Sequence, residues 1–294
     1  MKRITFTLIA TLLCIALFAQ TDTTKVPSNA DTIRIGGMVI IKRGDGDNGR
    51  RRTSITLGNK KNKKRSNIST AHWIVDLGFA NYIDKTDYTG ATSQNYIINK
   101  TGSPEKLGEN DFELKTGKSS NVNIWIFMQR INLIKQYVNL KYGLGVELNN
   151  YRFKSAISFK EGGLNPYNSS QNIPHPFVFR DSISFSKNKL AADYVTIPFM
   201  LNFRTNPDYA KKGLSLSTGI SIGYLYSSRN KQKSDERGKQ KNRGDYDIQK
   251  WKFAYIAELG LGPARLYGSY SPKSLFENGF NMKPYNVGIR LSNW

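Results

Sequence analysis

Eight segments of the chain alternate apolar and polar residues with a period of two. In residues 138–148 every even position is apolar or aromatic, and every odd position is Asn, Lys, Gly or Glu. The other segments cover residues 73–79, 122–128, 195–203, 214–224, 251–259, 264–270 and 285–291. Successive side chains of a β-strand point to opposite faces, so each segment predicts a strand with one apolar and one polar face. The pattern therefore predicts an all-β fold of eight antiparallel strands.

The connections between these segments alternate in length. Long polar connections cover residues 84–120, 154–189, 227–249 and 271–283, and short turns lie near residues 135–136, 206–208 and 262–263. In transmembrane β-barrels short periplasmic turns alternate with long extracellular loops. Closing the sheet also pairs every backbone N–H and C=O group, as hydrocarbon requires. Residues 72–294 are therefore predicted to form an eight-stranded antiparallel up-and-down transmembrane β-barrel. A soluble periplasmic β-domain that binds a small ligand is the alternative.

The polar faces of the strands carry charges of both signs. These residues are Asp76, Lys141, Glu147, Lys252, Glu258, Arg265 and Arg290. A basic residue that faces lipid at mid-depth costs about 2–4 kcal/mol, so the charges are expected to face the lumen. There they can pair with each other and with Asn123, Gln129 and Asn202. Because eight strands leave an interior only wide enough for side chains, this lumen charge network predicts a narrow, plugged lumen.

Tyrosine and tryptophan are concentrated near the ends of the strands. The positions are Trp73, Tyr82, Tyr137, Tyr151, Tyr224, Tyr226, Trp251, Tyr270 and Tyr285. Amphipathic rings favour the boundary between lipid and water, and these residues are therefore predicted to form aromatic girdles.

The N-terminus has the layout of a secretory signal peptide. Lys2 and Arg3 precede the apolar stretch 4–18, and polar residues follow from Gln20. Residues 1–20 are therefore predicted to be cleaved after Ala19 or Gln20, with an uncleaved anchor as the alternative. Cys14 is the only cysteine, so a cleaved chain contains none. Export makes nucleic acid an unsuitable partner, although the formal net charge is +22.

Two parts of the chain concentrate the positive charge. Residues 21–71 are predicted to be a flexible basic periplasmic leader with one short strand at 38–41, because like-charged blocks repel and do not pack. Its basic residues are Arg50, Arg51, Arg52, Lys60, Lys61, Lys63, Lys64 and Arg65. The second set lies in the long connection 227–249 and comprises Arg229, Lys231, Lys233, Arg237, Lys239, Lys241 and Arg243. Both sets are candidate polyanion contacts. The leader would bind a polyanion or an acidic protein, and the second set would bind lipopolysaccharide phosphates, unless each is simply a solvated segment.

The sequence offers little material for catalysis. The only histidines are His72 and His175, which excludes multi-histidine metal sites, and no phosphate-binding loop precedes a helix. We therefore expect no catalytic residues, no metal and no cofactor. The alternative is an outer-membrane enzyme acting on lipid or peptide, in which His175 would work with Asp181 or Ser182.

Three stretches of the chain carry a family resemblance. They are LAADYVTIPFMLNFR (190–204), GISIGYLY (219–226) and YNVGIRLSNW (285–294), which ends in the aromatic Trp294. Together they resemble the small outer-membrane β-barrel proteins of Bacteroidetes-type bacteria, including the PorT-like family. Proline has no backbone N–H to donate to the hydrogen bonds between strands, so Pro198 is expected to mark a bulge or a strand end.

This resemblance implies a location in the outer membrane of a Gram-negative bacterium and assembly by the barrel-insertion machinery. It also implies a structural, binding or secretion-accessory role, with a periplasmic or secretion-system protein as a further partner. It carries over no active-site residues.

Overall fold

The chain forms two compact units, residues 1–65 and 66–294. The structure is a computed structural model that describes residues 31–35, 38–42, 53–57, 66–206, 213–262 and 264–292. The second unit begins at residue 66, whereas the sequence predicts the barrel to begin at residue 72. The predicted signal peptide, the basic residues 50–52 and 60–65, and Trp294 lie outside the described residues.

The first unit contains a small antiparallel sheet. Its strands are β1 (Asp31–Ile35), β2 (Met38–Lys42) and β3 (Thr53–Leu57), in the order β1-β2-β3. The sequence predicted one strand in an otherwise flexible leader. The structure instead pairs that strand on both sides, with Ile40 opposite Ile33 and Ile55.

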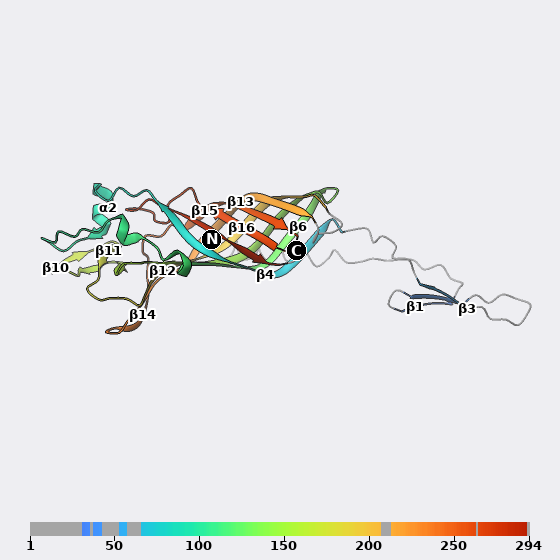
Figure 1. The fold of residues 1–294 in the computed structure, drawn as a ribbon, viewed down its shortest axis with the longest axis horizontal. Helices are drawn as coiled ribbons and strands as arrows, with labels where there is room; N and C mark the ends of the chain where they lie inside the picture. Colours follow the sequence, from blue (N-terminus) through green and yellow to red (C-terminus); the bar gives the residue numbers. More distant parts are fainter. Residues whose placement is uncertain are drawn as a thin grey trace, which may run out of the picture. The chain divides into compact units, whose positions relative to one another are not determined.

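Eight strands of the second unit close into a ring. They are β4 (Ile68–Asp84), β6 (Ser120–Ile134), β7 (Val138–Arg152), β12 (Lys187–Arg204), β13 (Leu214–Ser234), β15 (Trp251–Leu261), β16 (Ala264–Tyr270) and β17 (Met282–Leu291). Each strand pairs antiparallel with its neighbours in chain order, and the β17–β4 pairing completes the ring (Figure 1). Each predicted segment lies within one of these strands, which confirms the all-β, antiparallel prediction.

The two ends of the ring differ in complexity. At one end β6 and β7 are joined by a tight turn in which the Tyr137 N–H donates to the Ile134 carbonyl at 2.8 Å. At the other end the long connections fold back on themselves. They contain α2 (Ala91–Tyr96), β5 (Ile97–Ile98), β8 (Ile157–Lys160), β9 (Gly163–Asn165), β10 (Asn168–Ile173) and β11 (Phe177–Arg180), with short 3-10 turns at Glu109–Phe112 and Thr116–Lys118. We call this end the cap (Figure 1).

The cap has its own hydrophobic core. Phe112, Phe159, Phe276 and Phe280 are buried there with Tyr151, which comes from the end of β7. Two predicted girdle residues, Tyr82 and Tyr151, therefore belong to this core instead, with their ring centroids 5.8 Å apart. Tyr151 is part of the core because it has an odd position on β7, and the odd-numbered side chains of this strand, such as Lys141 and Glu147, point inward.

The connection 227–249, predicted as a loop, is mostly strand. β13 continues to Ser234 and pairs with β14 (Gly238–Arg243), which forms a hairpin at the cap end.

Pro198 was predicted to mark a bulge or a strand end, and this prediction is wrong. Pro198 lies inside β12, and the pairing with β7 skips residues 197–198 but resumes without a shift of register.

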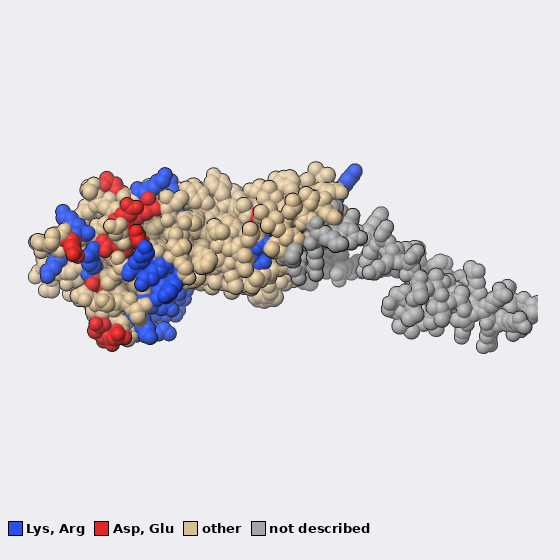
Figure 2. All heavy atoms as spheres, viewed as in Figure 1, with Lys and Arg blue, Asp and Glu red and all other residues tan. Residues whose placement is uncertain are grey.

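The outer face of the ring is an exposed apolar belt. Its large exposed residues are Leu77, Phe79, Val195, Ile197, Phe199, Leu201, Phe203, Leu216, Ile220, Phe253, Tyr255, Leu259, Leu266, Val287, Ile289 and Leu291. Figure 2 shows few charges over this part of the ring on the face drawn, and many at the cap. A continuous apolar surface of this extent is unusual for a protein in water. In the described part of the chain, no helix is long and apolar enough to cross a bilayer.

Candidate functional site

The inside of the ring brings together charges of both signs. Lys141 Nζ lies 2.5 Å from Glu258 Oε2, and Arg290 Nε lies 2.6 Å from Asp76 Oδ1. Arg290 also pairs with Glu258, so one guanidinium joins two carboxylates. All four of these side chains are almost fully buried, which makes the geometry of each pair important for stability.

A second ion pair and one further cation complete the set. Lys252 pairs with Glu147, and both side chains are buried. Arg265 is partly buried and interacts electrostatically with Glu258 and Arg290. The structure thus joins six of the seven predicted lumen charges in direct ion pairs, three carboxylates with three cations, so that the opposite charges offset each other.

Neutral side chains add further hydrogen bonds in the lumen. Trp125 Nε1 donates to Asp76 Oδ2 at 2.7 Å. Asn149 and Asn286 each donate to Glu147 Oε1 at 3.1 Å. Asn202 donates to Ser217 Oγ at 2.9 Å. Since a buried polar group without a partner is costly, these bonds stabilise the charges where they are.

Gln129 does not belong to this set. It was predicted to face the lumen, but its Nε2 donates to Thr70 Oγ1 at 3.0 Å and its Oε1 accepts from Tyr142, on the outer side of the sheet. The reason is a bulge, because the β6–β7 register shifts between Trp125 and Phe127. An extra residue in one strand reverses the faces beyond it. Met128 is consequently fully buried, although the alternation placed it outside.

Tyr267 is a further lumen residue, and the sequence pattern did not single it out. Its hydroxyl donates to Asn121 Oδ1 across the ring, and its side chain is buried. Tyr267 lies two residues after Arg265, so the period of two already contained the signal for its inward direction. The segment 264–270 was too short and too mixed for that signal to stand out.

A small cavity lies between these side chains. The cavity inside the ring measures about 30 Å³ and is lined by Asp76, Thr196, Ser221, Glu258 and Tyr267, among others. A single water molecule needs about 10–15 Å³ on this scale, so the cavity has room for about two.

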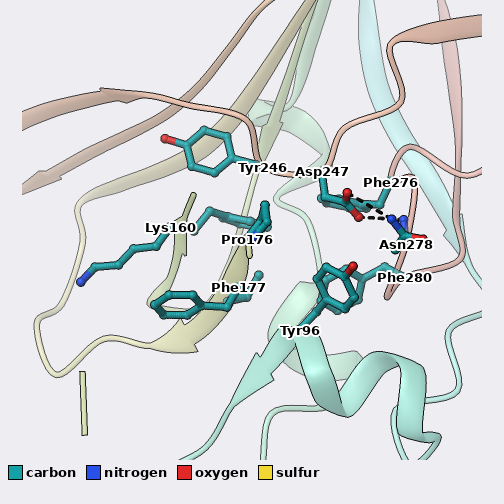
Figure 3. Close-up of a pocket in the computed structure, with 11 residues that line it drawn as sticks. Tyr96, Lys160, Pro176, Phe177, Tyr246, Asp247, Phe276, Asn278 and Phe280 are labelled. Carbon is teal, nitrogen blue, oxygen red and sulfur yellow. Dashed lines mark hydrogen bonds between the residues drawn. The ribbon is translucent and has the colours of Figure 1, made fainter. Parts of the chain in front are cut away.

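A small pocket lies in the described part of the cap. It measures about 10 Å³ and is lined mainly by aromatic residues, with Tyr96, Phe276 and Phe280 on one side (Figure 3). Asp247 accepts from the Asn278 backbone N–H at 2.7 Å and from its side-chain amide at 3.3 Å. Burial raises the pKa of Asp247 from its ordinary value. The pocket has room for about one water molecule and is part of the core of the cap.

The residues of the enzyme alternative have separate partners. The His175 ring packs on Tyr96 at 5.2 Å between centroids, and its Nδ1 lies 3.0 Å from the Pro176 carbonyl oxygen. Asp181 accepts from Ser158 Oγ at 2.9 Å and pairs with Arg237 at 2.8 Å. None of these contacts joins His175 to Asp181. They therefore do not arrange the two residues as a catalytic base and the carboxylate that orients it. Among the described residues, no group of three or more His, Cys, Asp or Glu side chains is placed to hold a metal ion.

Six of the seven basic residues predicted in the connection 227–249 lie on the β13–β14 hairpin. The register sets Arg229 opposite Arg243, Lys231 opposite Lys241 and Lys233 opposite Lys239. Arg237 lies in the turn between the strands and is held by Asp181, so its charge is already paired.

An antiparallel ring with an apolar outside and an ion-paired inside defines the class of outer-membrane-type β-barrel proteins. Residues 65–277 match the family model described as "Outer membrane protein beta-barrel domain", and the chain belongs to this family. It is accordingly an outer-membrane protein.

Comparisons with curated proteins and with solved structures do not identify a function. No curated protein matches the chain. Among solved structures, the chain is similar to Ail, the attachment invasion locus protein of Yersinia pestis, in complex with the heparin analogue sucrose octasulfate. That match has 13% sequence identity, covers 75% of this chain and 100% of that chain, and has a TM-score of 0.27. A likeness at this level carries no argument about function.

Proposed function

We propose that the protein is a non-enzymatic, eight-stranded up-and-down transmembrane barrel with a plugged lumen that acts as a binding or structural component of the outer membrane. The observation that carries this proposal is the contrast between the two faces of one ring of strands. Large apolar side chains such as Phe199 and Val287 are exposed outside, and ion pairs such as Arg290–Asp76 are buried inside. This is the distribution that lipid outside and a narrow polar interior require.

The proposal includes the route to the membrane. The N-terminal signal peptide would be cleaved on export, and the barrel-insertion machinery would then assemble residues 66–294. The cap would face the cell exterior, since long connections are extracellular in barrels of this kind. The PorT-like resemblance adds a secretion-accessory role with a periplasmic partner, and this part of the proposal depends on the three sequence stretches given above.

A membrane barrel of this kind is expected to stay folded in SDS until it is boiled. Its backbone hydrogen bonds close on themselves, so detergent can replace lipid around the belt without opening the sheet. Electrophoresis of unheated and boiled samples should give two different mobilities. A protein that is found in the soluble fraction and shows one mobility under both conditions would contradict the proposal and favour the soluble β-domain.

The plugged lumen predicts that the protein does not conduct ions. Liposomes that contain it should release a trapped small ion no faster than protein-free liposomes do. The cavity of about 30 Å³ has room for about two water molecules, so no continuous water path is expected. Single-channel recording provides the second measurement. Steady conductance steps at neutral pH would show that the lumen is open and that the charge network lines an ion pathway.

A further inference from the structure

A set of like charges lies on one face of four adjacent strands at the cap end. Its members are Arg152 on β7, Lys187 and Lys189 on β12, Arg229, Lys231 and Lys233 on β13, and Lys239, Lys241 and Arg243 on β14. We call this set the cationic face. It contains six of the seven basic residues that the sequence singled out in 227–249, together with three from other strands.

The strand register places these residues in rows. In the middle row Arg152 lies opposite Lys189, Lys189 lies opposite Lys231, and Lys231 lies opposite Lys241. A neighbouring row runs from Lys187 through Lys233 to Lys239. Residues directly opposite each other in an antiparallel pair share a face, with Cβ atoms about 4.5–5.5 Å apart. The positive charges are therefore held close together by backbone pairing.

The cationic face points away from the core of the cap. The residues between its members, Asn188, Asn230 and Gln232, are buried beneath the sheet. Lys233, Lys239 and Lys241 are exposed, and Lys189 and Lys231 are half-buried. Figure 2 shows Lys and Arg side chains gathered at this end of the molecule.

The same face of the sheet leads from the cationic face towards the apolar belt. On the odd-numbered face of β12, Lys189 is half-buried, Ala191 and Asp193 are buried, and Val195 and Ile197 are exposed. At about 3.3 Å per residue, Lys189 lies about 20 Å along the strand from Val195, which is about 14 Å along the membrane normal for a strand tilted by about 45°. The exposed Tyr224 and Tyr226 lie between the belt and the cationic face on β13. The middle row thus stands about 14 Å above the last exposed apolar residue of β12, beyond the belt and on the side where the charged groups of the lipids lie.

This arrangement costs stability in the isolated protein. Like charges directly opposite each other in a sheet are destabilising. Burial, together with the charges of Lys231, Lys187, Arg229 and Arg152, lowers the pKa of Lys189 to about 8. Within the described residues, Asp193 is the carboxylate that pairs with the cationic face, through Arg229. The other rows carry positive charge that a phosphate-rich ligand would offset.

We propose that the cationic face binds the phosphate groups of lipopolysaccharide in the surrounding outer leaflet. This inference rests on the proposed function, since it needs the barrel to be in the outer membrane with the cap outside. Lipopolysaccharide carries phosphates at and just above the hydrocarbon edge, on a molecule whose acyl chains would lie against the apolar belt. The ligand would therefore contact the belt and the rows at the same time, whereas a soluble polyanion would contact only the rows.

The test compares two triple variants with the same change in net charge. Lys189→Gln/Lys231→Gln/Lys241→Gln removes three charges from the middle row. Lys100→Gln/Lys106→Gln/Lys118→Gln removes three exposed charges from another part of the cap. Binding of fluorescent lipopolysaccharide to the purified full chain is measured in detergent at about 0.1 M salt, and both variants are first checked for the mobility shift on boiling.

The middle-row variant should bind lipopolysaccharide about 10- to 100-fold more weakly than the unmodified protein, since each basic residue near an anionic surface contributes to affinity. The control variant should stay within about twofold. Enzymatically dephosphorylated lipopolysaccharide should bind the unmodified protein as weakly as intact lipopolysaccharide binds the middle-row variant. Added salt should reduce the difference between the variants.

Three outcomes would overturn the inference. The middle-row variant could bind as well as the control, or removal of the phosphates could leave binding unchanged. A sulfated glycan such as heparin could depend on the middle row while lipopolysaccharide does not, which would identify a receptor for soluble polyanions instead. Loss of the mobility shift in the unmodified protein would contradict the proposed barrel itself, and is thus distinguishable from a failure of the lipid site.

Discussion

Replacing Arg290 with methionine should lower the free energy of unfolding by about 3–5 kcal/mol. The Arg290 guanidinium joins Asp76 and Glu258, and its charge also lies over the Trp125 ring, 5.7 Å from the centroid. Methionine fills a similar volume but leaves two buried carboxylates short of a cation. Removing one partner of a buried pair is costly for this reason, whatever the net contribution of the intact pair.

The measurement is urea unfolding of the barrel in detergent, followed by tryptophan fluorescence. Arg180→Met is the matched control, because Arg180 pairs with Glu105 and Asp111 but is itself 38% exposed, so the change should cost about 1 kcal/mol or less. Adding Asp76→Asn to Arg290→Met should recover part of the loss, since it removes the carboxylate that has lost its ion pair, whereas Glu258 keeps Lys141. A loss below about 1 kcal/mol for Arg290→Met would contradict a structural role for the charge network. If Arg290→Met does not refold at all, the unfolding free energy of the Arg290→Met/Asp76→Asn double variant is compared with that of the unmodified protein instead.

The period of two was sufficient to predict the ring and the inward direction of most polar residues. Lys141 and Glu147 lie six positions apart on β7, and an unbroken strand necessarily points both to the same face. The same rule failed at Gln129 because a bulge adds a residue, and nothing in the local composition distinguishes that residue from its neighbours. The register describes which residues of two strands lie opposite each other, so it cannot be inferred from the alternation pattern of one strand alone.

Only part of the cationic face could be predicted from the sequence, for a different reason. Residues 229–243 contain mostly Lys, Arg, Asn, Gln and Ser, a composition depleted in strand formers, so the sequence predicts a loop whose basic residues either contact lipopolysaccharide phosphates or are simply solvated. The hairpin forms because β12 continues to Lys187 and provides a neighbour for the upper half of β13. Lys187 and Lys189 join the rows only through that pairing, so their contribution could not be inferred from the basic run itself.

A valine at Gly78 or Gly288 should prevent the barrel from folding. The two glycines lie opposite each other on β4 and β17. A Cβ atom at Gly78 would stand 2.5 Å from the Tyr267 hydroxyl oxygen and 2.5 Å from the Val287 carbonyl oxygen. A Cβ atom at Gly288 would stand 2.5 Å from the Gly78 Cα. These are backbone contacts as well as side-chain contacts, so no change of rotamer relieves them.

The measurement is the fraction of protein that shows the mobility shift after refolding into detergent. Gly108→Val is the control, because a Cβ atom there meets nothing within 4 Å and the backbone is extended, with a φ of −144°. That variant should refold as the unmodified protein does, whereas Gly78→Val and Gly288→Val should lose most of the shifted band. Equal folded fractions for Gly78→Val and Gly108→Val would contradict the close packing.

The expected difference follows from the width of the ring. Eight strands enclose little space, and the Tyr267 ring occupies that space while its hydroxyl donates to Asn121. An aromatic side chain packed over glycines in a sheet replaces the contacts that those glycines lack. Adding Tyr267→Ala to Gly78→Val should therefore fail to restore folding, because the contact with the Val287 carbonyl oxygen remains and the lumen loses its largest neutral side chain on β16.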